Sequence, residues 1–239
     1  MISRRAKEIP PFLVMDILEK AQELERHGAD IIHLEVGEPD FDTPVKIRQA
    51  AQAAFNNGET HYTHSLGILS LREAIAEHYN SKYNVNVSSD QVLVTMGTSP
   101  ALHMILALLL DPGDQIILSD PAYACYPNFV RFVGGEPIAI TVHADNNFEL
   151  DVDNVRKAIF PKTKAILINS PSNPTGTLLS KENMNSLAGL EIPIISDEIY
   201  HGLVYGETES SILEFTNNAF VINGFSKYYA MTGWRLGYI

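Results

Sequence analysis

The chain has 239 residues, 45 % of them hydrophobic, and a formal net charge of -12 at pH 7. This length and apolar content can bury a sizeable core in one large domain, with or without a small flanking piece. The strong negative charge argues against nucleic acid or an anionic membrane surface as a partner.

The rarer residues and the apolar runs exclude further classes. The single cysteine, Cys125, cannot form an intrachain disulfide and is expected to pack beside Tyr126. The eight histidines offer no pair at the spacing of a helical metal site, so we expect no metal. The longest apolar run, 101–110, is interrupted by His103 and is too short to span a bilayer, and residues 1–14 lack a secretory pattern. We therefore expect a cytoplasmic chain without a membrane partner.

The hydrophobic pattern alternates between helical and strand periods along the chain. It predicts helices over 15–27, 45–57 and 70–83, then strand 91–95, helix 100–110, strand 115–119, helix 126–133, strand 137–142, helix 151–160, strand 165–169, helix 180–190, and strands 193–196 and 220–223. Residues 206–218 are predicted as a loop, and 234–239 as a strand whose exposed edge would invite pairing with another chain. The alternation is typical of an α/β fold with a mostly parallel sheet and helices on both faces, in three layers.

Short motifs follow the predicted strands. In chain order they are Met96-Gly97-Thr98-Ser99, Pro121-Ala122-Tyr123, Ser170-Pro171-Ser172-Asn173-Pro174-Thr175-Gly176, Ser196-Asp197-Glu198-Ile199-Tyr200 and the run from Gly224 to Tyr238. Ligands of open α/β sheets bind where parallel strands end. The motifs therefore predict a ligand site at that edge of the sheet.

The lysine of the last motif is the most informative residue. Lys227 lies in a segment poor in charge, after the apolar run 220–222 and beside Ser226. Desolvation lowers the pKa of a lysine and leaves a neutral amine that can attack an aldehyde. Arg235, eight residues further on, is suited to bidentate binding of an anion.

Each of the other motif residues also has an ordinary interpretation when it is taken alone. Asn173-Pro174 is a turn signal, Asp197 a cap and Tyr123 a packing residue. Their joint occurrence in this order favours a cofactor site.

The motifs resemble, in residue type and order, the class I/II aminotransferases, which are fold type I enzymes dependent on pyridoxal 5′-phosphate (PLP). The resemblance covers essentially the whole chain. It implies that residues 46–239 form the PLP-binding large domain, and that residues 1–45 contribute to the small domain and the substrate loop. Family members are typically longer. The chain is thus expected to lack the C-terminal portion that completes the small domain and supplies an arginine for the substrate's α-carboxylate.

The resemblance implies a role for each matching residue. The residues expected to act in catalysis are Lys227, as the Schiff-base lysine, Asp197, which faces the pyridine nitrogen, and Tyr200, which with Asn173 donates to the phenolate oxygen. PLP is an electron sink only while its ring nitrogen stays protonated, which is why a buried carboxylate is required. Tyr123 would stack on the ring.

The remaining expected contacts concern the phosphate, the substrate and a second subunit. The phosphate group would be bound by Gly97, Thr98, Ser99, Ser226, Arg235 and the Tyr62 of a partner subunit, and the substrate by Gly37 and Asn173. The family more often has a serine three positions before the lysine, where this chain has Gly224. Glycine at position 37 permits close backbone approach to the substrate.

The function implied is transfer of an amino group between an L-amino acid and a 2-oxo acid by a homodimer, through a Schiff base on Lys227. Two alternatives remain at this stage. One is another fold type I PLP enzyme, such as a β-lyase or a cyclopropane-forming (ACC-synthase-like) enzyme. The other is a catalytically impaired fragment that binds PLP. The identity of the amino donor is left open.

Overall fold

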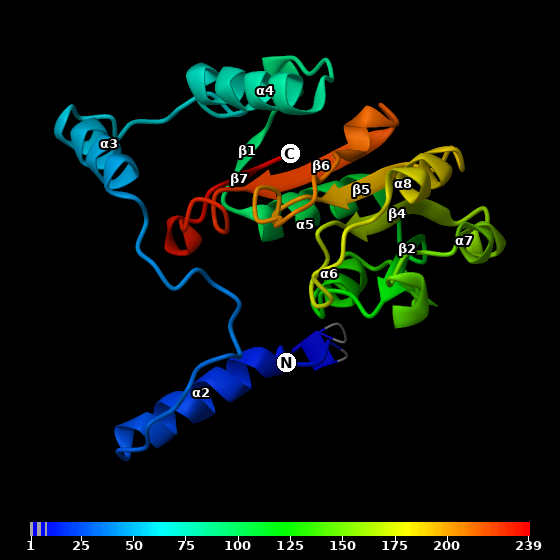
Figure 1. Ribbon diagram of the computed structural model, residues 1–239, viewed down its shortest axis with the longest axis horizontal. Coiled ribbons are helices and arrows are strands. Elements are labelled where there is room, and N and C mark those ends of the chain that lie inside the picture. Colours follow the sequence, from blue (N-terminus) through cyan, green and yellow to red (C-terminus); the bar gives the residue numbers. More distant parts are fainter. Residues whose placement is uncertain (1, 4–5, 8) are drawn as a thin grey trace.

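Seven strands form one sheet in the computed structural model, which describes residues 2–3, 6–7 and 9–239 (Figure 1). The strands are β1 (Val94–Thr95), β2 (Gln115–Asp120), β3 (Glu136–Thr141), β4 (Thr163–Asn169), β5 (Ile194–Asp197), β6 (Ala219–Gly224) and β7 (Gly237–Tyr238), in the spatial order β1-β7-β6-β5-β4-β2-β3. The five strands from β6 to β3 are parallel, whereas β7 runs antiparallel to β6 and β1. The predicted mostly parallel sheet is confirmed.

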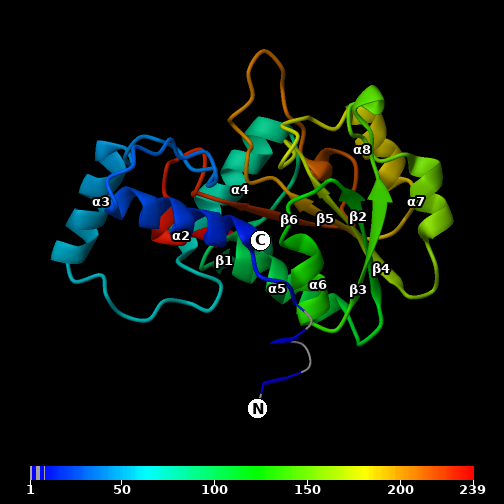
Figure 2. The same ribbon diagram turned by 90° about the horizontal axis from the view of Figure 1, so that it is seen from below.

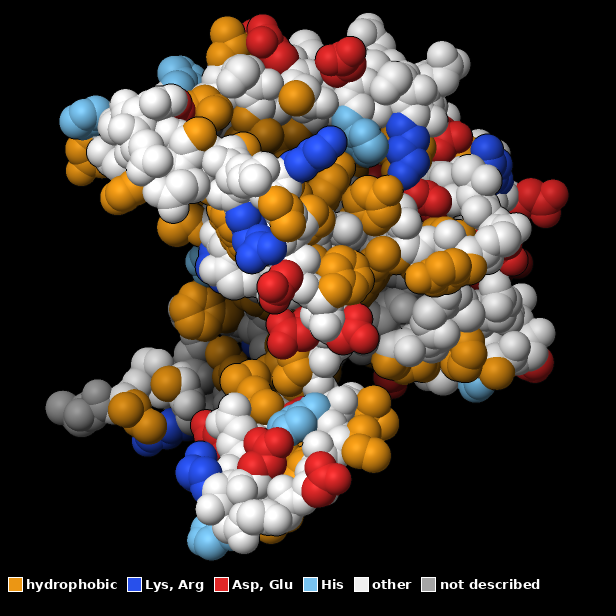
Figure 3. Space-filling model, turned by 60° about the vertical axis from the view of Figure 1, so that its left-hand side comes forward, with side chains coloured by type: hydrophobic (Ala, Val, Ile, Leu, Met, Phe, Trp, Pro, Cys, Tyr) orange, Lys and Arg blue, Asp and Glu red, His pale blue; other side chains and the backbone are white. Residues whose placement is uncertain are grey.

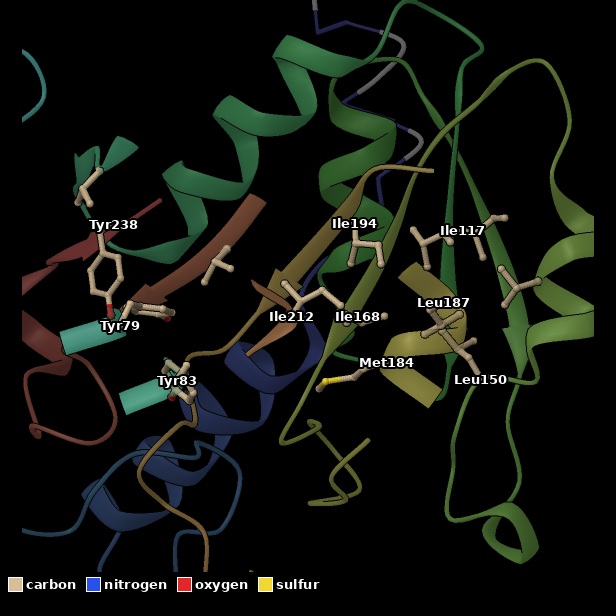
Figure 4. Packing of buried hydrophobic residues seen from close by; sticks show 14 of the residues in the cluster. Tyr79, Tyr83, Ile117, Leu150, Ile168, Met184, Leu187, Ile194, Ile212 and Tyr238 are labelled. Atoms are coloured by element: carbon tan, nitrogen blue, oxygen red, sulfur yellow. The ribbon is translucent and has the colours of Figure 1, made fainter. Parts of the chain in front are cut away.

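Helices cover both faces of this sheet. They are α4 (Leu69–Tyr83), α5 (Thr98–Leu109), α6 (Tyr126–Phe132), α7 (Val152–Ala158) and α8 (Lys181–Ala188). Alternate strand residues point to opposite faces, so Ile117 belongs to a core cluster that includes residues of α4, α7 and α8, and Ile116 to a second cluster with residues of α5 and α6. Figure 4 shows the first of these layers, in which Met184 and Leu187 of α8 lie against the strands. Each fully buried Ile or Leu stabilises the fold by about 1.5–3 kcal/mol.

Most element boundaries lie within two residues of the predicted ones, but the strand predicted over 91–95 is wrong for its first three residues. The strand is confined to Val94–Thr95, and Ser89–Gln91 forms a 3-10 turn. The backbone N–H of Ser88 donates to Gln91 Oε1 at 3.0 Å. This capping box stabilises a helical turn where the apolar pattern alone favours an extended strand.

The strand predicted over 234–239 is also wrong in extent and in position. Residues Thr232–Trp234 form a 3-10 turn, and Arg235 has φ of +53°, a left-handed conformation that interrupts an extended chain. Only Gly237–Tyr238 is a strand, and it lies between β1 and β6 rather than at an edge. A Cβ at Gly237 would lie 2.8 Å from the backbone carbon of Gly97, so glycine permits this close strand contact.

The N-terminal part of the chain projects from the sheet. It contains α2 (Leu13–Arg26) and α3 (Val45–Asn56), joined by an extended segment. Both helices lie at the opposite end of the molecule from α7 (Figures 1 and 2). Ala21 is the one buried residue of α2, and α3 has none. Figure 3 shows this part standing out from the body with hydrophobic side chains on its surface.

Candidate active site

The carboxyl ends of three neighbouring strands place the predicted site residues together. Strand β4 ends at Asn169, β5 at Asp197 and β6 at Gly224, and each is followed by one of the predicted motifs. A cavity of about 490 Å³ opens beside these ends. Its lining includes Lys227, Tyr200, Asn173, Gly37, Glu38 and Phe41. The extended segment before α3 therefore closes one side of a site whose other side is the sheet edge.

The buried carboxylate of the site is Asp197, the last residue of β5. Its side chain accepts hydrogen bonds from the Tyr126 hydroxyl at 2.8 Å and from the Ile199 backbone N–H at 3.2 Å. Burial raises the pKa of Asp197 to about 6, against the lowering effect of those hydrogen bonds and of the positive charge of Lys227. A positively charged group placed beside Asp197 would lower this pKa, and the carboxylate would then be fully ionised.

The amine of the site is Lys227, three residues after β6. Its Nζ donates to the backbone carbonyl of Gly37 at 2.5 Å and lies 6.0 Å from the centre of the Tyr200 ring. Partial burial lowers the pKa of Lys227, and the charge of Arg235 lowers it further, while Glu38 and Asp197 act in the opposite direction. The lysine predicted from sequence therefore lies in the cavity with an amine that deprotonates more readily than an exposed one.

Two neutral donors, Asn173 and Tyr200, line the cavity together with Lys227. Asn173 Nδ2 donates to the Tyr200 hydroxyl at 3.2 Å, which brings together the two residues that the sequence paired. The backbone N–H of Asn173 donates to Asn169 Oδ1 at 2.7 Å, and this holds the loop onto the end of β4. Tyr123 is half-buried and packs edge-on against Tyr126, with ring centres 5.3 Å apart.

The start of helix α5, together with Arg235, is suited to bind an anion. Helix α5 begins after Gly97, which has φ of +95°, and within the described chain no side chain caps its first N–H groups. The Arg235 guanidinium lies against Gly97, where a Cβ would come within 2.7 Å of Arg235 Nη2. Free N–H groups at a helix start together with a guanidinium attract phosphate. Thr98 and Ser99, both half-buried, form the first turn.

Two of the predicted residues, Ser226 and Tyr62, do not line the cavity. Ser226 is half-buried next to Lys227. A serine at position 224 has no room, because a Cβ at Gly224 would lie 2.9 Å from the Leu236 carbonyl oxygen. Tyr62 lies fully exposed on the connection between α3 and α4, and the cavity lining does not include it.

Sequence reasoning missed several residues that shape the site. Tyr126 supports Asp197 from helix α6, and Glu38 and Phe41 line the cavity. Asn169 could have been predicted from sequence, because a polar residue at the end of an apolar strand lies at the edge of the sheet where ligands bind. Tyr126 had no such signal, because its partner is 71 residues away in the chain.

The described residues contain no group of three or more His, Cys, Asp or Glu side chains that could hold a metal ion. Within the same residues, no helix has the length and apolar content required to cross a membrane.

Residues 29–239 match the family described as aminotransferase class I and II, and the chain belongs to this family. Over its full length it is 46 % identical to the (5-formylfuran-3-yl)methyl phosphate transaminase of Methanocaldococcus jannaschii. It is 40 % identical over 99 % of its length to the aspartate/prephenate aminotransferase of Thermus thermophilus. In each case it covers 63 % of the relative. Family membership confirms the resemblance found in the motifs.

Solved structures of the family share the fold. The whole chain superposes on the aspartate aminotransferase from Thermus thermophilus with maleate, with a TM-score of 0.96 at 39 % identity, and covers 64 % of it. The corresponding values for the alanine aminotransferase from Pyrococcus furiosus are a TM-score of 0.94, 37 % identity and 63 % coverage. The fold is therefore that of the fold type I enzymes, and PLP is the cofactor of this family.

The side chains present fit PLP. The cofactor requires a buried carboxylate, neutral donors for its ring oxygen, a phosphate corner and a lysine with a lowered pKa. The chain contains each of these: Lys227 and the neutral donors line the cavity of about 490 Å³, Asp197 is the buried carboxylate at the end of β5, and Arg235 lies against Gly97 at the start of α5.

Proposed function

We propose that the chain supplies the PLP-binding part of an aminotransferase that moves an amino group between an L-amino acid and a 2-oxo acid. The observation that carries the proposal is the position of Lys227, whose amine lies in the cavity with a lowered pKa. The chain spans about 63 % of the length of its curated relatives, which belong to the same family and are transaminases by name.

Each residue of the site would have a separate task. Lys227 would bind the cofactor covalently and, once displaced by an amino acid, would remove the proton from the substrate Cα and return it at the neighbouring carbon. PLP, when bound, supplies a sink for the electron pair left at Cα. Asp197 would keep the proton on the ring nitrogen, while Tyr126 and the Ile199 N–H hold this carboxylate in place.

The other side chains would orient the cofactor and the substrate. Asn173 and Tyr200 would donate to the ring oxygen and Tyr123 would stack on the ring. The start of α5, with Gly97, Thr98 and Ser99, would bind the phosphate together with Ser226 and Arg235. Gly37, whose carbonyl accepts from Lys227, would lie beside the substrate carboxylate with Asn173.

The test is a half-reaction. The purified chain is mixed with PLP, and glutamate, aspartate, alanine and tyrosine are then added in turn while absorbance and 2-oxo acid release are followed. We expect one donor to convert the bound cofactor to its amine form with an equal amount of 2-oxo acid. Release of pyruvate and ammonia without the amine form would instead indicate a lyase, and a lysine-bound cofactor that no donor changes would indicate binding without catalysis.

Substitution of Gly97 tests the phosphate corner. We expect Gly97→Ala to raise the Kd for PLP at least about 10-fold, because the new Cβ collides with the guanidinium of Arg235. Gly58→Ala is the matched control: Gly58 also has a positive φ, +76°, but its Cβ would meet nothing within 4 Å. Both variants carry about 1–3 kcal/mol of backbone strain. Equal PLP affinity in the two variants would contradict the assignment.

We also propose a homodimer in which Tyr62 of one subunit reaches the phosphate of the other. Its complete exposure in the single chain leaves the phenol available for such a contact. Sedimentation would show whether the chain dimerises, and an unchanged Kd for PLP in Tyr62→Phe would count against this role.

For the domains, we propose that residues 46–239 are the PLP-binding unit and that residues 1–45 belong to a small domain. The apolar side chains of Ile17, Leu24, Ile32 and Leu34 are exposed, as expected of a surface that a further part of the protein covers. A chain extended to the length of the relatives should protect this segment from proteolysis.

A cytoplasmic location is part of the proposal, and cell fractionation tests it.

A further inference from the structure

A buried histidine lies next to the proposed ring-oxygen donors, in the same turn as Tyr200 and in contact with the loop that carries Asn173. His201 follows Tyr200 in the turn after β5 and is 6 % exposed. Its Nε2 lies 3.0 Å from the Ser170 carbonyl oxygen, and its Nδ1 lies 2.6 Å from the Tyr83 hydroxyl. His201 thereby connects helix α4 to the first residue of the loop that carries Asn173.

The partners of His201 determine its tautomer. A carbonyl oxygen can only accept, so Nε2 must carry the hydrogen and donate to Ser170. Nδ1 then accepts from the Tyr83 hydroxyl. Burial lowers the pKa of His201 to about 4, so the ring is neutral near pH 7 and the Glu198 oxygen 3.4 Å from Nδ1 forms no ion pair with it.

Consecutive residues of this turn contact two points of the loop. His201 donates to Ser170 at the start of the loop, and Tyr200 accepts from Asn173 three residues later. Because Tyr200 and His201 are consecutive in one turn, and Ser170 and Asn173 lie three residues apart in one loop, we expect a movement of Ser170 relative to His201 to move Asn173 relative to Tyr200 as well. Tyr83 holds the imidazole from the opposite side, so the ring cannot rotate away without losing a buried hydrogen bond.

We propose that His201, fixed by Tyr83, is a positioning residue that sets the geometry of Asn173 and Tyr200 toward the ring oxygen of the cofactor. The inference rests on the proposed function, because it concerns the same two donors. His201 touches neither the cavity nor the amine and acts through the loop alone.

The chain offers matched substitutions. His201→Gln places an amide nitrogen near the position of Nε2 and retains a donor for Ser170, whereas His201→Leu fills a similar space without any donor. Tyr83→Phe leaves His201 in place and removes its fixed partner. If His201→Leu does not fold, Tyr83→Phe still tests the same connection, and circular dichroism decides which variants are folded.

The first readout needs no cofactor. Hydrogen–deuterium exchange of the segment 170–177 measures how firmly the loop is held in the chain alone. We expect exchange there to become at least about 10-fold faster in His201→Leu, close to wild type in His201→Gln and intermediate in Tyr83→Phe. The segments around Gly97 should not change.

The second readout is the pH midpoint of the visible band of the lysine-bound cofactor. Donors to the ring oxygen favour its ionised form and lower this midpoint. Loosening them in His201→Leu should raise it by about 0.7 pH unit, since one hydrogen bond is worth about 1 kcal/mol and one pH unit about 1.4 kcal/mol. His201→Gln should restore the wild-type midpoint.

The outcomes are distinguishable. Wild-type exchange and an unchanged midpoint in His201→Leu would overturn the inference. Equal disturbance by His201→Gln and His201→Leu would overturn it as well, because packing alone would then explain the effect. If the wild-type chain forms no lysine-dependent band, the proposed function fails, while the exchange rates still decide whether His201 holds the loop.

Discussion

Lys227→Ala is expected to abolish the lysine-bound cofactor band and to lower the rate of amino transfer by at least about 10⁴-fold, because it removes the nucleophile and the proton carrier together. The fold should be nearly unaffected. Lys227 is only partly buried and its burial disfavours the charged form, so we expect the free energy of unfolding to change by less than about 1 kcal/mol. The measurements are absorbance with PLP, single-turnover transfer and urea unfolding of the chain without cofactor.

Two controls separate chemistry from charge. Lys227→Arg keeps a positive charge near Glu38 but cannot form the covalent bond, so it should lose the band as completely as Lys227→Ala. Lys157→Ala removes an exposed lysine of α7 and should leave both the band and the rate unchanged. A band that persists in Lys227→Ala would place the covalent bond on another amine and would contradict the proposed site.

The strands that carry the site were predictable from sequence because local and global signals agree there. The apolar runs of β4, β5 and β6 are short and buried, and each ends in a polar motif. For the same reason the positions of Asn173, Asp197 and Lys227 at one sheet edge followed from the α/β alternation. These are properties of single segments, which a pattern of residues encodes directly.

The features that sequence reasoning missed or misplaced depend on contacts between distant segments. The Tyr126–Asp197 hydrogen bond joins helix α6 to strand β5. The insertion of β7 beside β6 depends on the close backbone approach of Gly237 to Gly97, and Arg235, in a left-handed conformation, lies with its side chain against Gly97. The extended segment that brings Gly37 to Lys227 joins residues 190 positions apart. No periodicity within one segment specifies such contacts.

Asp197→Asn is expected to lower the rate of amino transfer and, at neutral pH, to raise the stability of the chain without cofactor. The carboxylate would hold the proton on the ring nitrogen, and a neutral amide cannot provide that charge-assisted hydrogen bond. We therefore expect amino transfer to fall by at least about 10³-fold, at about 1.4 kcal/mol of transition-state stabilisation per factor of ten. Asp145→Asn, at an exposed carboxylate in a 3-10 turn, should leave the rate unchanged.

The same substitution should stabilise the chain without cofactor at neutral pH. Burial raises the pKa of Asp197 from 3.8 to about 6, so ionisation in the folded state is unfavourable. By linkage this costs about 3 kcal/mol at pH 7, and we expect Asn to recover about 2 kcal/mol, because one of the two donors at this site would then face an amide NH₂.

The pH dependence has a definite sign. The folded chain holds a proton on Asp197 between the unfolded pKa of 3.8 and the folded pKa of about 6. The contribution of this group to stability therefore falls as pH rises through that window and is constant above it. Urea unfolding should show the advantage of Asp197→Asn at pH 8 and its loss near pH 4. If the variant is less stable than wild type at pH 8, Asp197 is not a strained buried carboxylate, and its proposed role as a charge held ready for a cationic ring would lose its physical basis.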